Sequence, residues 1–209
     1  MPRKNRPKNG AKWRADASNR AMKRLCWAVL LFLATISLPA HAQGLDATAS
    51  SVTIRVFKSG LFAVFAHDHT ISAPISSGSL DVGKRAIRLT FQSREMKVVD
   101  KDVSESDRST VERTMKSDEV LGVEKFPEIV FQSTSVDPSG ANRFDVRGDL
   151  SLHGKTLPIA MPVSFQNGRY SGSVKLKQTD YNITPVRIAG GTVRVKDEIE
   201  VTFEIVPTK

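Results

Sequence analysis

Apolar and polar residues alternate along most of this chain with a period of two. In residues 51–57, 86–91 and 198–205, nearly every second side chain is apolar, and the runs at 143–153 and 156–165 repeat the pattern. Successive side chains of a strand point to opposite faces, so this pattern is typical of antiparallel strands with one buried face. The predicted buried faces are Val52, Ile54, Val56, Ile87, Leu89, Phe91, Phe144, Val146, Leu150, Leu152, Leu157, Ile159, Met161, Val163, Phe165, Ile199, Val201, Phe203 and Ile205.

Turn-forming and irregular residues separate or interrupt these runs. Asn167-Gly168, between two runs, predicts a two-residue hairpin loop. Pro158 and Pro162 fall on the outward face of their run, and their missing N–H groups indicate an edge or a weakly paired segment. Three consecutive charged residues at 196–198 interrupt the last run, which predicts a bulge or bend there rather than a site.

Two segments depart from the strand pattern. Residues 104–122 are rich in charge and contain a cap residue, Ser104 or Ser106, before a narrow apolar stripe. They predict a short helix over 104–117 that lies on one end or one side of the sheet. Residues 179–191 end in two glycines and predict a long irregular loop. We expect the helix and the loop to act as lids.

Strands therefore dominate, with about nine strand candidates, one helix and no alternation of strands with helices. This favours an all-β fold, an extended antiparallel barrel of about eight strands with one short α-helix. Closing a sheet into a barrel removes its edges, and eight strands leave an interior wide enough for one small ligand.

The N-terminal 42 residues have the three parts of a secretory signal peptide. A basic segment precedes the apolar run 26–38 and the small-residue pattern Ala40-His41-Ala42. We expect cleavage before Gln43 and a periplasmic or secreted protein. The alternative is a retained membrane anchor, although the apolar run is short for a membrane span.

Two smaller expectations concern where the folded domain begins. Translation from Met22 is one hypothesis, because the sequence from Met22 onward is already an ordinary signal peptide. Export that is unchanged after mutation of the Met22 codon would argue against it. Residues 43–50, which are mostly small, are predicted to be a flexible leader before a barrel domain at 51–207.

The net charge of +9 belongs mainly to the N-terminal segment. Residues 1–42 hold nine basic residues and one acid, so residues 43–209 have 22 basic and 21 acidic residues, a net of +1. This balance excludes a nucleic-acid partner, because no basic surface is left to neutralise phosphates. The single cysteine, Cys26, also lies in the N-terminal segment, so the mature chain has no disulfide and no thiol chemistry. With no nucleophile elbow, P-loop or dinucleotide motif, we predict a protein that is not an enzyme.

Four segments of the chain form a recognisable series. The most telling is VEKFPEIVFQSTSV (123–136), an aromatic-Pro-x-Ile-x-Phe-x-Ser-Thr pattern after an acidic helix. The others are KSGLFAVFAHDHTISAPISSGSL (58–80), VRGDLSLHGKTLPIAMPVSF (146–165), and LKQTDYNI together with VRVKDEIEVTFEI (within 176–205). In this order, the four segments resemble the YceI-like family of lipid- or polyisoprenoid-binding proteins. The chain departs from the commoner family pattern at FAHDHT, which leaves the fold unchanged but bears on the ligand's head group.

The resemblance implies a lipocalin-like barrel with an elongated apolar interior for an isoprenoid chain, such as that of a quinone or a polyprenyl lipid. It also implies a periplasmic or secreted location. We expect no resident cofactor other than such a lipid, and transient contact with a membrane. We therefore expect a carrier or sequestering protein. Its candidate ligand-binding residues are Phe65, His67, His69, Ile87, Leu89, Phe91, Phe131, Leu150, Leu152, Met161 and Phe165.

His67 and His69 leave three interpretations open. On a strand they share one face with their Cα atoms about 6.6 Å apart, which suits two ligands of one metal ion, with His153 as the third histidine. The strand register, however, places His153 on the outward face. Alternatively, neutral imidazoles offer a donor and an acceptor to a ligand head group, or the pair is structural at the barrel rim with Asp68 as its partner. A metal-binding protein and a ligand-free envelope stress or interaction module thus remain the alternatives to a lipid carrier.

Overall fold

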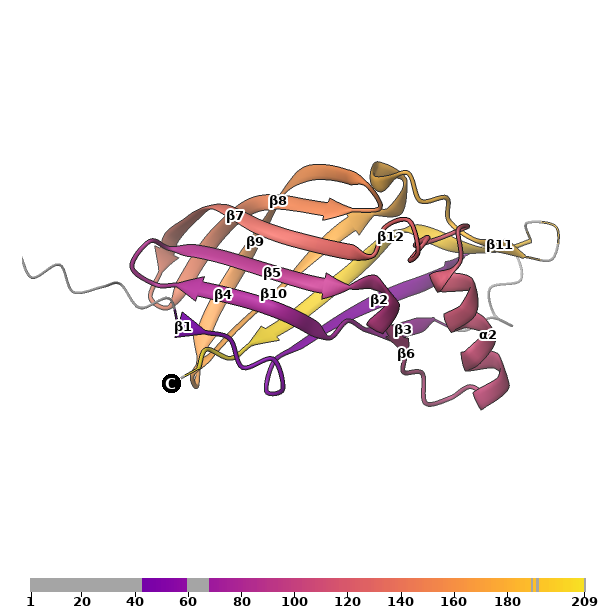
Figure 1. Cartoon of the computed structure of the whole chain (residues 1–209), viewed down its shortest axis with the longest axis horizontal. Helices are drawn as coiled ribbons and strands as arrows, with labels where there is room; N and C mark the ends of the chain where they lie inside the picture. Colours follow the sequence, from indigo (N-terminus) through magenta and orange to yellow (C-terminus); the bar gives the residue numbers. More distant parts are fainter. Residues whose placement is uncertain (1–42, 60–67, 189, 191, 209) are drawn as a thin grey trace, which may run out of the picture. The chain divides into compact units, whose positions relative to one another are not determined.

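The computed structural model describes residues 43–59, 68–188, 190 and 192–208, which lie in one compact unit, Ala40–Lys209. Its strands form one twelve-stranded sheet in which every pair is antiparallel (Figure 1). The eight strands of seven or more residues are β2 (Ser51–Ser59), β4 (Ile75–Asp81), β5 (Ala86–Gln92), β7 (Glu128–Gly140), β8 (Arg143–Leu152), β9 (Lys155–Gln166), β10 (Arg169–Lys177) and β12 (Val193–Ile205). The shorter elements are β1 (Gln43–Gly44), β3 (His69–Ser72), β6 (Lys97–Val98), β11 (Arg187–Ile188), the helix α2 (Glu105–Lys116) and the 3-10 helices η2 (Ser93–Glu95) and η3 (Gln178–Tyr181).

Hydrogen bonds join the strands in the order β1-β4-β5-β7-β8-β9-β10-β12-β2-β3-β6, with β11 beside β12. Figure 1 shows the long strands curling around a common interior, with α2 at one end of them. The predicted all-β, lipocalin-like antiparallel barrel of about eight strands with one short α-helix is therefore confirmed for the described part of the chain. No helix within those ranges is long and apolar enough to cross a membrane.

The hairpin loops contain the residues that tight turns require. Asn167 and Gly168 both have positive φ, as do His153 and Gly154, and each pair joins strands whose flanking residues are directly opposite one another. Two central residues with positive φ match the right-handed twist of the flanking strands. The hairpin predicted at Asn167-Gly168 is thus present.

Strand β9 is paired along most of its length on one side only. It pairs with β8 from Lys155 to Ser164, but β10 pairs only with its last four residues, Val163–Gln166. Pro158 and Pro162 lie exposed in the part without a β10 partner. The missing N–H groups of these prolines therefore predicted this weakly paired segment.

Two phenylalanine rings lie directly over glycines of neighbouring strands. A Cβ atom on Gly148 would come within 2.6 Å of the Phe131 ring and 2.5 Å of the backbone oxygen of Gln132. A Cβ on Gly172 would likewise come within 2.7 Å of the Phe203 ring. Each ring takes the space of the side chain that its glycine lacks, and this arrangement fixes both rings on the inner surface of the sheet.

Residues 43–50 differ from the flexible leader that the composition predicts. Gln43 and Gly44 form β1 and pair with β4, and the Asp46 N–H donates to the backbone oxygen of Val206 at 2.9 Å. A backbone bridge also joins Leu45 to Pro207. This correction has a physical reason, because the pairing uses backbone groups that every residue carries, and small side chains neither signal nor oppose it.

Helix α2 confirms the predicted helix and its cap. The Ser104 Oγ accepts a hydrogen bond from the Asp107 N–H at 3.1 Å, and acidic residues occupy the first turn. The helix is tied to the sheet by Glu112, whose carboxylate accepts from the Val98 N–H of β6 at 3.1 Å. Its buried residue is Met115, so the predicted apolar stripe faces the sheet.

Candidate functional site

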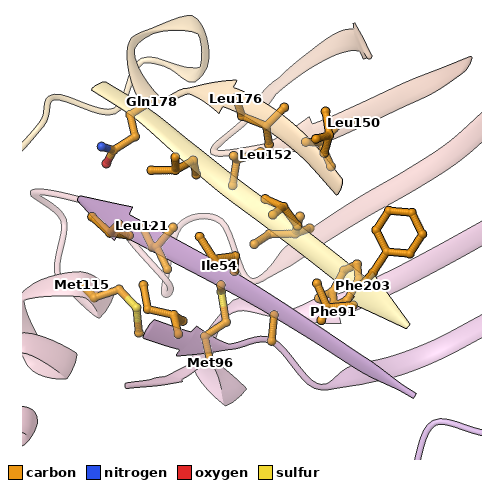
Figure 2. Close-up of a pocket in the computed structure, with 18 of the residues that line it drawn as sticks. Ile54, Phe91, Met96, Met115, Leu121, Leu150, Leu152, Leu176, Gln178 and Phe203 are labelled. Atoms are coloured by element: carbon orange, nitrogen blue, oxygen red, sulfur yellow. The ribbon is translucent and has the colours of Figure 1, made fainter. Parts of the chain in front are cut away.

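The barrel encloses an apolar cavity of about 640 Å³. Nearly every long strand contributes side chains to its lining, and α2, η3 and the loop after η3 close one end. Figure 2 shows the inward side chains, among them Ile54, Leu150 and Leu152. A volume of this size is within the range of small-molecule sites, which are concave and mostly apolar.

The strand register divides the cavity into an apolar end and a polar end. Along the inner face of β10 the residues run Tyr170, Val174 and Leu176, and Gln178 follows at the start of η3. In the neighbouring row, Ala73 lies just after β3, and Ile71 and then His69 follow toward the start of that strand. Their neighbours are in register, because Leu176 pairs with Ile199, Ile199 with Val56, and Val56 with His69. Gln178 and His69 thus lie at the same end of the barrel, each at the end of a row of apolar side chains.

Figure 2 shows the same division. Gln178 lies on the side of Met115 and Leu121, whereas Phe91 and Phe203 lie on the opposite side. The polar end is therefore the end that α2 covers.

The structure brings most of the predicted ligand-binding residues to this cavity. Of the eleven, the lining includes His69, Ile87, Leu89, Phe91, Phe131, Leu150, Leu152 and Met161. Phe65 and His67 lie outside the described residues. Their role in binding a ligand remains a prediction.

Phe165 does not line the cavity. Its ring packs on Tyr170, with the ring centroids 4.5 Å apart, next to the hairpin loop between β9 and β10. The alternation pattern correctly placed Met161 and Val163 of β9 on the inner face. Phe165, near the end of the strand, lies beyond the cavity and packs on a neighbouring ring instead.

His69 is held by a buried carboxylate. Its Nδ1 lies 2.7 Å from Asp100 Oδ2, and the other oxygen of Asp100 accepts from the Thr70 N–H at 2.6 Å. Asp100 is 9% exposed, whereas the His69 side chain is 23% exposed and reaches the cavity. Because a carboxylate only accepts, the proton of the neutral ring sits on Nδ1, and Nε2 becomes an acceptor. Asp68, the partner expected for the pair, instead accepts from the Lys58 N–H at 2.9 Å.

His153 lies in a different environment. It occupies the hairpin loop between β8 and β9 with φ 49°, its Nδ1 lies 3.0 Å from the Tyr181 backbone oxygen, and its ring contacts Phe126 at 4.3 Å between centroids. The described residues contain no group of three or more His, Cys, Asp or Glu side chains that could hold a metal ion.

Sequence reasoning missed the polar groups of η3. Its helix starts with Gln178, whose Nε2 donates to the Lys196 backbone oxygen at 2.8 Å, and ends with Tyr181, which is 2% exposed. Asp197 anchors the same helix by accepting from the Thr179 N–H at 2.9 Å. The charged run at 196–198 is indeed a bulge, since the register of β12 against β2 shifts between Val195 and Ile199. Asp197 of this bulge also anchors η3, and the alternation pattern gave no indication of that contact.

Comparisons with known proteins agree with this architecture. The model of the family described as "YceI-like domain" matches residues 44–206. A UPF0312 protein of Vibrio parahaemolyticus is 25% identical over 195 residues, covering 86% of this chain and 98% of the relative. A UPF0312 protein of Pseudomonas syringae pv. tomato is 34% identical over 109 residues, covering 47% and 54%.

Among solved structures, Burkholderia cenocepacia BcnA superposes with a TM-score of 0.58 at 20% sequence identity, covering 78% of this chain and 99% of BcnA. This likeness concerns the fold. Because the family model covers well over half of the sequence, the chain belongs to the YceI-like family.

Proposed function

We propose that this protein carries or sequesters a lipid with a long apolar chain, of the isoprenoid type found in quinones and polyprenyl lipids. The observation that supports this is the cavity itself, whose lining from β2, β5, β8 and β12 is apolar along most of its length. A packed core has few voids larger than a water molecule, so a cavity of about 640 Å³ is a binding feature rather than a packing defect.

The size of the cavity limits the part of the ligand that it can enclose. Taking about 30 Å³ per non-hydrogen atom, the share of a water molecule in the liquid, it holds roughly 20 such atoms. At about 0.3 kcal/mol per atom, such a ligand gains about 6 kcal/mol, which corresponds to dissociation constants of tens of micromolar. A longer chain would extend beyond the cavity.

The proposal includes a periplasmic or secreted location and transient contact with a membrane, where such lipids are collected and delivered. The signal-peptide pattern of residues 1–42 supports export. The apolar character of the ligand supports the membrane contact, because an isoprenoid chain partitions into bilayers.

Native mass spectrometry tests the carrier function directly. The protein is expressed from its full coding sequence, recovered without chelator or detergent, and measured before and after extraction with organic solvent. We expect a discrete added mass that leaves with the solvent, and renewed uptake when the stripped protein is offered a polyprenol or a quinone at micromolar concentration. Failure of the stripped protein to take up either lipid would refute the proposal. An added mass of one metal ion that survives extraction would instead support the metal-binding alternative.

A further inference from the structure

Two arginines lie side by side where the cavity reaches the surface. Arg187 of β11 is directly opposite Arg194 of β12, and both residues are exposed. Residues opposed in an antiparallel pair have their Cβ atoms about 5 Å apart, and like charges in that position destabilise the sheet. Because the exposed Arg194 also lines the cavity, the pair lies at an opening of the cavity. A negatively charged partner would relieve the repulsion between the two guanidinium groups.

Two lysines extend this positive surface. Lys196 follows Arg194 by two residues in β12, and Lys177 ends β10, the neighbour of β12 in the sheet. Both lysines are exposed, and Lys177 also lines the cavity. Lys177, Arg187 and Lys196 form no ion pair with any residue in the described part of the chain. We call the surface made by Lys177, Arg187, Arg194 and Lys196 the basic patch.

An aromatic ring adjoins the basic patch. Phe57 of β2 is half-buried, with the Arg55 Cζ 5.2 Å and the Lys196 Nζ 5.7 Å from its ring centroid. Phe57 also contributes to the lining of the cavity, so its ring lies beside the same opening. Basic side chains next to an apolar ring are a combination that peripheral membrane proteins use at the lipid surface.

The acidic groups close to the basic patch in the sequence are largely paired within the protein. The Glu198 carboxylate lies 2.9 Å from the Lys175 ammonium, and Asp197 accepts from the Thr179 N–H at 2.9 Å. Asp180 is exposed in η3, and its carboxylate offsets at most one of the four positive charges. Helix α2, at the same end of the barrel, has three acidic and three basic residues and thus no net charge. The basic patch therefore keeps an excess of positive charge.

We propose that the basic patch docks the protein on the surface of a bilayer that contains anionic phospholipids, with the opening of the cavity toward the membrane. This inference deepens the carrier function, on which it rests, because it names the face that meets the membrane and the charge of the lipids that attract it. Each lysine or arginine near an anionic bilayer raises the affinity about five-fold at low salt. Four such residues give an attraction that is strong enough to orient the protein and weak enough to remain reversible.

Sedimentation with large vesicles tests the basic patch. The vesicles contain phosphatidylcholine alone or mixed with phosphatidylglycerol, and the protein is expressed from its full coding sequence. The test variant combines Arg187→Gln with Lys196→Gln, because neither of these residues lines the cavity. At about 0.01 M salt, we expect it to bind the vesicles with phosphatidylglycerol about 25-fold more weakly than wild type. At about 1 M salt, where the Debye length is about 3 Å, wild type and variant should bind equally weakly.

The matched control removes the same charge at the other end of the barrel. Lys84 and Arg85 are exposed in the loop between β4 and β5, and Figure 1 shows this loop at the end opposite α2 and β11. Lys84→Gln combined with Arg85→Gln should keep vesicle binding within about two-fold of wild type. All variants share one N-terminus, so the basic residues of 1–42 produce no difference between them. Thermal unfolding verifies that both double variants are folded.

Uptake of farnesol, a short isoprenoid alcohol, from solution separates docking from lipid binding. Both double variants should take up farnesol with wild-type affinity, because the lining of the cavity is unchanged. Equal vesicle binding by the two double variants, or equal binding of wild type to vesicles with and without phosphatidylglycerol, would overturn the docking surface and leave an acidic protein as the partner to test. A wild type that takes up no lipid would instead refute the carrier function, in a measurement that involves no vesicle.

Discussion

Replacing Ile54 with tryptophan tests whether the interior of the barrel is open. Ile54 lies near the middle of β2, opposite Val201 of β12 and Ile71 of β3, and points into the cavity in Figure 2. Tryptophan adds about six non-hydrogen atoms, close to a third of the roughly 20 that the cavity holds. Because these atoms enter existing space, we expect the unfolding free energy to stay within about 1 kcal/mol of the wild type.

The same substitution should displace ligand. At about 0.3 kcal/mol per displaced atom, binding loses about 2 kcal/mol, which is about a 20-fold increase in the dissociation constant for farnesol. Titration calorimetry gives the affinity and thermal unfolding gives the stability. Arg55→Trp is the control, because Arg55 is the next residue of β2, points outward, and has a side chain that is 53% exposed. It should change neither quantity appreciably.

A solid core would give the opposite result. Extra atoms in a well-packed interior cost about 1–3 kcal/mol, which for a domain of this size lowers the unfolding temperature by roughly 2–4 °C per kcal/mol. A clear loss of stability in Ile54→Trp together with unchanged farnesol affinity would refute the open cavity and the carrier function built on it.

Three further predictions concern the parts that shape the cavity. Gly148→Ala should destabilise the protein by about 1–3 kcal/mol in urea unfolding, because its Cβ would overlap the Phe131 ring. The control Gly140→Ala, whose Cβ meets nothing nearer than 3.7 Å, should cost under about 1 kcal/mol. Equal effects of the two substitutions would contradict the close approach at Gly148. Ser104→Ala should remove the cap of α2 and lower stability by about 0.5–2 kcal/mol, with faster amide exchange in the first turn as the local readout. The backbone hydrogen bond from Thr179 lowers the pKa of Asp197. The Asp197 carboxylate therefore stabilises the fold fully above the ordinary aspartate pKa of about 3.9, and this contribution is lost as the pH falls through the lowered value. The stability difference between wild type and Asp197→Asn should shrink over that acidic range, and a difference independent of pH would argue against a role for the negative charge.

The alternation of side chains predicted the wall of the barrel well. A strand places every second residue on the same face regardless of where its neighbours come from, so inward positions such as Ile87, Leu89 and Leu150 could be identified without knowing the topology. The loop at Asn167-Gly168 was equally accessible, because its conformation favours those residue types locally.

The contents of the polar end could not be predicted in this way. The His69–Asp100 contact joins residues 31 positions apart, and neither strand pattern nor spacing indicates which carboxylate meets the imidazole. Tyr181 lies in a segment without alternation, where no period relates a side chain to the interior. The β1 pairing near the N-terminus depends on backbone groups, which carry no residue-specific signal.

The rings over Gly148 and Gly172 have an evolutionary consequence. Neither residue of a glycine–phenylalanine pair can change without cost, because any side chain at the glycine position needs the volume that the ring fills. Enlarging Gly172 first obstructs Phe203, while shrinking Phe203 first leaves a void over a bare stretch of backbone. A Cβ at Gly148 or Gly172 would also come within 2.5 Å of a backbone oxygen, that of Gln132 or Pro162, so a smaller ring alone cannot make room for a larger residue. Both glycines should therefore be retained among YceI-like sequences even where the facing ring varies.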